Sequence, residues 1–137
     1  MKKILVFAAS VLLAVSSLSS CKKESSNVIA KPVINLTEVG HKNSKVATIG
    51  KDMHLEGTIE AEGLIKEINV EIHKEGGKFE IEKSFKEGKY IGVKNTKFHE
   101  HIDIPANAPE GEYHLHFTVI DKQGQTATSE VHIKVTK

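Results

Sequence analysis

Histidine is the residue type in this sequence whose number and spacing could support chemistry. The chain has eight histidines in 137 residues, and it contains neither arginine nor tryptophan. Two pairs follow the pattern His-x-His, at residues 99–101 and 114–116. A neutral imidazole binds Zn²⁺, Cu²⁺ or Ni²⁺ through a ring nitrogen, and three or four such ligands make a site. The spacing therefore points to transition-metal binding as one function to weigh.

Beyond residue 30, apolar and polar side chains alternate, which is the pattern of half-buried β-strands. We find no stretch of helical periodicity. Short strands separated by turns predict an all-β fold, an antiparallel β-sandwich of about seven strands. The predicted strands span residues 31–39, 52–61, 65–74, 78–85, 97–105, 112–121 and 126–136.

The turn between the last two predicted strands decides which side chains face one another. A two-residue loop would pair His114 with Val131 and set a polar face against an apolar one, since a shift of one residue inverts a strand. A three-residue loop over residues 122–124, with Gly124 in the left-handed conformation, keeps both faces consistent. This second register pairs His114 with His132, and His116 with Glu130.

Side chains two residues apart share a face, and directly opposed residues have Cβ atoms about 5 Å apart. The predicted register therefore gathers candidate metal ligands into two clusters on opposite sheets. Exposed strand positions also accept unliganded histidines, so a merely solvated surface is the competing interpretation. The first cluster comprises His73, His114, His116, Glu130 and His132, and the second comprises His54, Glu56, His99 and His101.

The C-terminal third carries a series of short motifs between apolar strands: Ala108-Pro109, Gly111-x-Tyr113 and Asp121-x-x-Gly124. This series resembles an immunoglobulin-like domain of the bacterial surface type. Together with the run over residues 98–105 and His54-x-Glu56 upstream, residues 31–136 resemble domain-of-unknown-function family four-six-two-five, an uncharacterised family of bacterial lipoproteins. The resemblance implies an immunoglobulin-like fold and no established activity.

The N-terminus has the features of a secretory signal. Lys2 and Lys3 precede 15 uncharged residues, 4–18, which is shorter than the roughly 20 residues of a membrane-spanning helix. Leu18-Ser19-Ser20-Cys21 resembles the lipobox of bacterial lipoproteins, in which the cysteine is acylated. We expect a signal peptide over residues 1–20, lipidated Cys21 with a flexible tether over residues 21–30, and a folded domain over residues 31–137. An uncleaved apolar helix with a buried cysteine is the alternative.

Cys21 is the only cysteine, so no disulfide can form within the chain and the domain must be held by its core. Anchoring through lipid places the chain at the cell envelope. Lys22 follows the cysteine where similar inner-membrane lipoproteins have Asp, which favours the outer membrane. Lys22-Lys23-Glu24 matches a surface-export signal only in part, so the periplasmic and surface leaflets both stay open.

Composition argues against several function classes. Once Lys2 and Lys3 are set aside, 17 lysines face 18 acidic residues, and such a balance without arginine is not typical of nucleic-acid binding. The alternation is expected to bury at least three of the six aromatic side chains beyond residue 21, which leaves few for a stacking surface and argues against carbohydrate binding. No nucleophile motif or phosphate loop is present, so we do not expect an enzyme. Two classes stand: an interaction module for a protein partner at the envelope, or a lipoprotein that binds Zn, Cu or Ni.

Overall fold

The computed structural model describes residues 28–137. The predicted signal peptide, Cys21 and most of the predicted tether lie outside the described residues. The described chain forms eight strands and one 3₁₀ turn. They are β1 (Val33–Val39), η1 (His41–Asn43), β2 (Val46–Thr48), β3 (Asp52–Glu60), β4 (Ile65–Lys74), β5 (Glu80–Phe85), β6 (Asn95–Asp103), β7 (Gly111–Asp121) and β8 (Thr126–Thr136).

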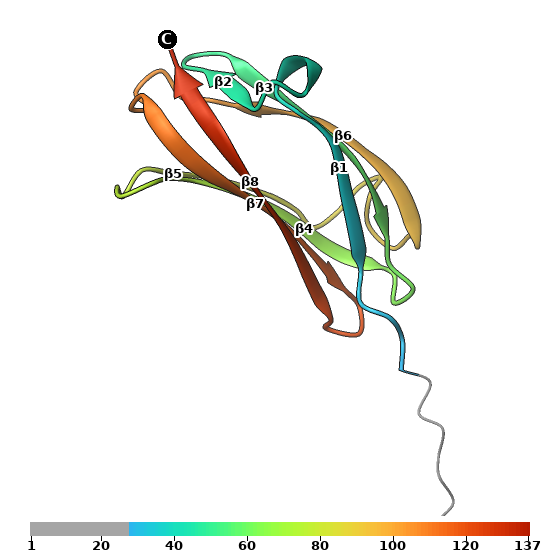
Figure 1. Ribbon diagram of the computed structural model, residues 1–137. Coiled ribbons are helices and arrows are strands. Elements are labelled where there is room, and N and C mark those ends of the chain that lie inside the picture. Colours follow the sequence, from blue (N-terminus) through green and yellow to red (C-terminus); the bar gives the residue numbers. More distant parts are fainter. Residues whose placement is uncertain (1–27) are drawn as a thin grey trace, which may run out of the picture.

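The strands form two sheets that pack face to face (Figure 1). The smaller sheet has the order β1-β3-β6, and the larger has the order β2-β8-β7-β4-β5. The predicted immunoglobulin-like β-sandwich is confirmed, with eight strands rather than about seven. The additional strand is β2, which has three residues and pairs in parallel with β8. It escaped prediction because three residues are too few to show an alternating pattern.

The core lies between the two sheets and is built from the apolar residue of each alternating pair. Leu55, Ile72 and Leu115 are fully buried. The rings of Phe98 on β6 and Phe117 on β7 meet across the interface, with centroids 4.9 Å apart and planes at 80°, an edge-to-face contact that aromatic pairs favour. This contact joins the two sheets directly and fixes which face of each strand points outward.

The β7–β8 hairpin adopts the predicted three-residue loop. His114 pairs with His132 and His116 with Glu130, and Gly124 has a φ of 82°, in the left-handed region. Buried Asp121 stabilises this turn, because its Oδ1 accepts the backbone N–H of Gln123 at 2.9 Å and that of Gln125 at 2.8 Å. The register prediction is therefore confirmed, and the turn explains it.

The described chain starts at Val28 at one end of the sandwich and finishes at Lys137 at the opposite end (Figure 1). We call these the entry end and the far end. At the entry end the Gln125 amide donates to the carbonyl of Ile29 at 2.6 Å. Contact with the domain therefore begins before β1. Since the pairing is antiparallel except between β2 and β8, β3 and β7 begin at the far end, whereas β4, β6 and β8 finish there.

The Asp121 turn makes a stability prediction possible. A Cβ added at Gly63 would lie 2.3 Å from Asp121 Oδ2, whereas one added at Gly77 would meet only the flexible Lys74 side chain at 3.3 Å. We expect Gly63→Ala to lower the free energy of unfolding by about 1–3 kcal/mol, the usual cost of overpacking. Gly77→Ala is the matched control and should change it by less. Urea denaturation followed by circular dichroism measures both, and equal stabilities would contradict the close packing at Gly63.

Candidate functional site

Strand alternation turns the predicted histidine side chains outward. His54 stands between buried Met53 and Leu55, and His114 stands between buried Tyr113 and Leu115. Because successive side chains of a strand point to opposite faces, burial of the neighbours sends each imidazole to the outer surface. His73, His99, His101, His116 and His132 likewise lie on the outer faces of the sheets, and none of them is buried.

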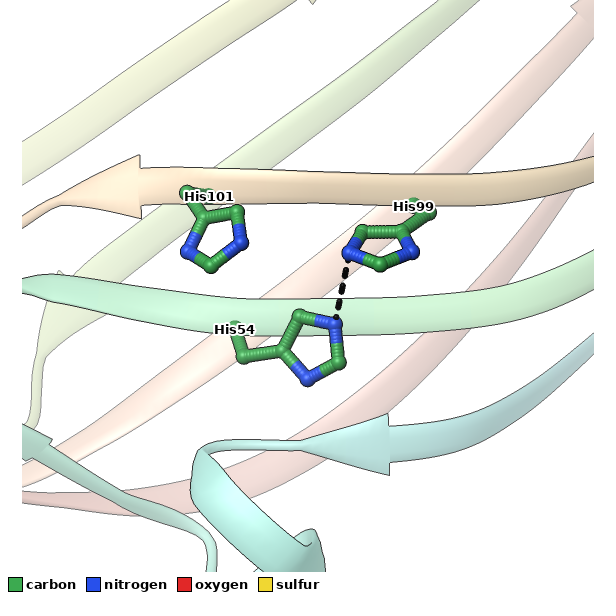
Figure 2. A group of neighbouring side chains, drawn as sticks. All are labelled: His54, His99 and His101. Carbon is green, nitrogen blue, oxygen red and sulfur yellow. Dashed lines mark hydrogen bonds between the residues drawn. The ribbon is translucent and has the colours of Figure 1, made fainter.

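On the smaller sheet, three imidazoles gather over β3 and β6; we call His54, His99 and His101 the β3–β6 cluster. His54 is opposite His101 in the strand register. Its ring centroid lies 4.6 Å from that of His99 and 5.2 Å from that of His101. Figure 2 shows the three rings together, with the Nε2 atoms of His54 and His99 at 3.1 Å. The three histidines that the sequence analysis grouped on this sheet therefore lie together in the structure.

Carboxylates contact the Nδ1 atoms of two of these rings, those of His54 and His101. His54 Nδ1 lies 3.0 Å from Glu38 Oε1, and His101 Nδ1 contacts the Asp52 carboxylate. A carboxylate on one ring nitrogen favours the tautomer that leaves the other nitrogen free to accept or to bind a metal. The pairing with Glu38 and Asp52 thus directs the Nε2 atoms of His54 and His101 into the cluster. The hydrogen bond from His54 also lowers the pKa of Glu38.

The spacing of the ring nitrogens can be compared with a metal site. One nitrogen from each of the three histidines can be chosen so that all lie within 4.8 Å of one another. In a tetrahedral zinc site with Zn–N bonds of about 2.0–2.1 Å, ligand nitrogens lie about 3.3–3.4 Å apart. The 3.1 Å between His54 and His99 is close to that value. The third nitrogen comes into range by a small ring rotation, which an exposed side chain such as His101 can make.

Glu56, the remaining candidate on this sheet, lies at the margin of the cluster. Its Oε2 is 3.9 Å from His54 Nε2, and it can form a ligand group with Glu38 and His54. Beside the cluster, toward the far end of the sandwich, is a surface depression of about 310 Å³. It gives a bound ion room for a further small ligand. Its polar lining residues are His41, Thr48, Lys51, Asp52, His54 and His101.

The backbone beneath His99 is held by a buried tyrosine from the β5–β6 loop. The hydroxyl of Tyr90 accepts the His99 N–H at 3.2 Å and lies 2.8 Å from the His99 carbonyl. It also lies 2.7 Å from Glu100 Oε1. Burial raises the pKa of Glu100, but the hydrogen bonds from Tyr90 and Lys89 outweigh it and the net shift is downward. Tyr90 therefore fixes the position of β6 where it carries the cluster.

On the larger sheet, the candidates and Glu71 form two rows across β4, β7 and β8. In one row His73 faces His114, and His114 faces His132; in the next, Glu71 faces His116, and His116 faces Glu130. We call the five residues predicted from the sequence, His73, His114, His116, Glu130 and His132, the β4–β7–β8 cluster. The prediction that His73 lies beside the central strand is confirmed by this pairing.

The members of the β4–β7–β8 cluster differ in how closely they meet. His114, Glu130 and His132 have ligand atoms within 4.8 Å of one another. His73 instead stacks on His114 and on His116, with centroids 5.3 and 4.9 Å apart. His114 Nδ1 lies 2.8 Å from Glu130 Oε1, and this hydrogen bond lowers the pKa of Glu130. The first three residues thus make a compact group, and His73 and His116 lie against it.

The sequence analysis missed two carboxylates that contact the β3–β6 cluster, those of Glu38 and Asp52. Asp52 lies two residues before His54, so the same-face rule that grouped His54 with Glu56 could have found it. Glu38 gave no such signal. The register of β1 shifts between Leu36 and Glu38, and a bulge of this kind cannot be read from alternation.

The two clusters lie on the outer faces of opposite sheets, with the buried core between them. They share one end of the sandwich. His54 is near the start of β3 and His101 near the finish of β6, which both lie at the far end; His73, His114 and His132 are placed likewise on β4, β7 and β8. In Figure 1 this is the end opposite Val28.

Fold and surface together define an immunoglobulin-like β-sandwich with histidines on both outer faces. The chain belongs to the family described as Domain of unknown function (DUF4625), which matches residues 19–136. This confirms the family resemblance found in the sequence. No curated protein matches the chain. Within the described residues, no helix has both the length and the apolar character needed to cross a membrane.

The His114–Glu130 hydrogen bond predicts a pH effect. Since the pKa of Glu130 is lower in the folded chain, the carboxylate stabilises the fold above about pH 4.3, and this stabilisation is lost as the pH falls through the folded-state pKa. We expect His114→Ala to raise the pKa of Glu130 toward its usual value, measured by carbon-13 NMR of the carboxyl group. His41→Ala is the control and should leave it unchanged; an unshifted titration in His114→Ala would show that the hydrogen bond is not formed in solution.

Proposed function

We propose that this chain is a lipid-anchored protein of the bacterial cell envelope that binds a transition-metal ion at the β3–β6 cluster. One observation carries the metal proposal. Carboxylates occupy Nδ1 of both His54 and His101, so these rings present Nε2 toward His99, as in the carboxylate–histidine–metal arrangement of known sites.

The contact between His54 and His99 favours a cation over a purely solvated surface. Two Nε2 atoms at 3.1 Å require that one carries a proton and the other accepts it, or that a positive ion binds both lone pairs. The proton shared by the two rings marks the place that a positive ion would take. A divalent ion between the rings would also be attracted by the nearby carboxylates of Glu38, Glu56 and Asp52.

The donor atoms select the class of metal. Imidazole nitrogen suits Zn²⁺, Cu²⁺ and Ni²⁺, whereas Mg²⁺ and Ca²⁺ prefer oxygen ligands. With three protein ligands, a four-coordinate ion keeps one open position, for which the adjoining depression provides space. Binding and transfer of an ion, rather than catalysis, is the role we propose.

The anchor proposal rests on the N-terminal sequence, and the position of the cluster supports a joint role. An anchor preceding Val28 would hold the entry end of the sandwich toward the membrane, so the histidines at the far end would face away from it. Lys22 after the acylated cysteine supports the outer membrane, in either leaflet. That the domain also contacts a protein partner at the envelope stays a prediction.

Metal binding is tested by calorimetric titration of the full chain in detergent micelles with Zn²⁺, Cu²⁺ and Ni²⁺. We expect micromolar or tighter binding. Replacing both His99 and His101 by Ala should weaken binding at this site by more than about 100-fold. Glu38→Gln or Asp52→Asn, each of which removes a carboxylate that orients a ligand ring, should weaken it by about 10–100-fold.

Glu87→Gln, which removes an exposed carboxylate outside both clusters and the adjoining depression, is the matched control and should bind as the unaltered chain does. Circular dichroism verifies that each variant is folded. Heats equal to those of buffer dilution, or binding that is the same in the His99/His101 variant, would reject the β3–β6 cluster as a metal site.

Lipid anchoring is tested by expressing the chain in bacteria fed an alkyne-labelled fatty acid. We expect the label on the unaltered chain, an N-terminus at Cys21 by mass spectrometry, and partition into the membrane fraction. Cys21→Ser should abolish the label and leave the chain unprocessed, because the thiol is the acylated group. A labelled Cys21→Ser chain, or an unaltered chain that retains residues 1–20, contradicts the proposal.

A further inference from the structure

The larger sheet carries its own arrangement of ligand atoms, which the proposal above does not use. Its central strand β7 lies between β4 and β8, and all three strands contribute to the β4–β7–β8 cluster. The imidazoles of one row, His73, His114 and His132, lie opposite one another across the three strands. The next row is formed by Glu71, His116 and Glu130. Six side chains able to bind a metal thus occupy adjacent positions on one outer face.

We infer that this face holds a second transition-metal site, formed by His114, Glu130 and His132. The ligand atoms of these residues already lie within 4.8 Å of one another. Glu130 Oε1 is central, since it lies 2.8 Å from His114 Nδ1 and 3.8 Å from His132 Nε2. An ion that replaces the proton between His114 Nδ1 and Glu130 Oε1 would be bound by one carboxylate oxygen and two imidazole nitrogens. Zn²⁺ and Cu²⁺ accept this donor set.

The two sites differ in the part played by the carboxylates. In the β3–β6 cluster, Glu38 and Asp52 lie on the nitrogens turned away from the neighbouring rings and orient them. On the larger sheet, Glu130 lies between the two imidazoles and binds the ion directly. The negative charge of Glu130 offsets part of the charge of a divalent ion, which the three neutral imidazoles of the other site do not.

His73 is placed to be a further ligand. Its Nδ1 lies 3.1 Å from Glu71 Oε1, which leaves Nε2 free. Its ring lies parallel to that of His114 within 13° at a centroid distance of 5.3 Å. A rotation of the His73 ring would complete a four-ligand set, so its loss should weaken the site without removing it.

The two sites must act independently. Fully buried Tyr113 and Leu115 flank His114 and point into the core, so the two ions would lie on opposite outer surfaces with the whole sandwich between them. No single ion can bridge the clusters of one chain. The expected stoichiometry is one ion per cluster, two per chain.

The experiment measures bound Zn²⁺ per full chain in detergent micelles by equilibrium dialysis and elemental analysis. We expect two ions for the unaltered chain and one when His99 and His101 are both Ala. Adding His114→Ala and His132→Ala to that variant should remove the remaining ion, whereas adding His73→Ala should weaken it several-fold. Glu87→Gln, at an exposed position outside both clusters, is the control with both ions retained.

The outcomes separate this inference from the proposed function. If the chain without His99 and His101 binds no ion, the second site is wrong and the first survives. If it keeps its ion after His114 and His132 are also replaced, the second site is equally wrong. If His114→Ala and His132→Ala alone remove all binding, the second site is supported and the proposed function fails. With Cu²⁺ as the probe, electron paramagnetic resonance of the variant without His99 and His101 should show nitrogen coupling that the further replacement of His114 and His132 abolishes.

Discussion

Packing of one side-chain row of every strand against a shared core is the constraint on which the rest of this structure depends. The apolar rows of the two sheets meet in a single core, where the rings of Phe98 and Phe117 join them. Because side chains alternate strictly along a strand, this burial also fixes the direction of every residue between. The core beneath them therefore decides on which face the histidines lie, and contacts such as those of Glu38 and Asp52 then orient the rings.

Much of the fold and the membership of both clusters could be predicted for that reason. The predicted bounds of β4 and β8 agree with the structure, and those of the other five predicted strands agree within two residues. The pairing of His114 with His132 followed from one argument, that only a three-residue turn keeps apolar faces together. The hydrogen bonds to buried Asp121 stabilise the turn, but the register could be predicted without knowing them.

Features that depend on the chain path between strands could not be predicted. The segment joining β1 to β2 crosses from the smaller sheet to the larger, and Gly40, Lys42, Asn43 and Lys45 have positive φ values there. Three of these are not glycine, so composition gives little sign of such a path. The same holds for Glu38, whose approach to His54 depends on the bulge in β1. Which histidines contact and which stack likewise depends on rotamers, beyond what spacing determines.

The hydroxyl of Tyr90 has a consequence for how copies of the chain behave beside one another. β6 is an outer strand of its sheet, and an unpaired strand edge is a template on which another chain can add a strand. The Tyr90 hydroxyl hydrogen-bonds both the backbone N–H and the carbonyl of His99 at that edge. A strand from another chain therefore has no backbone donor or acceptor to pair with at this residue. Copies of the chain at high concentration would thus be kept from pairing edge to edge at this point of β6, and the imidazole face there would stay open to solvent.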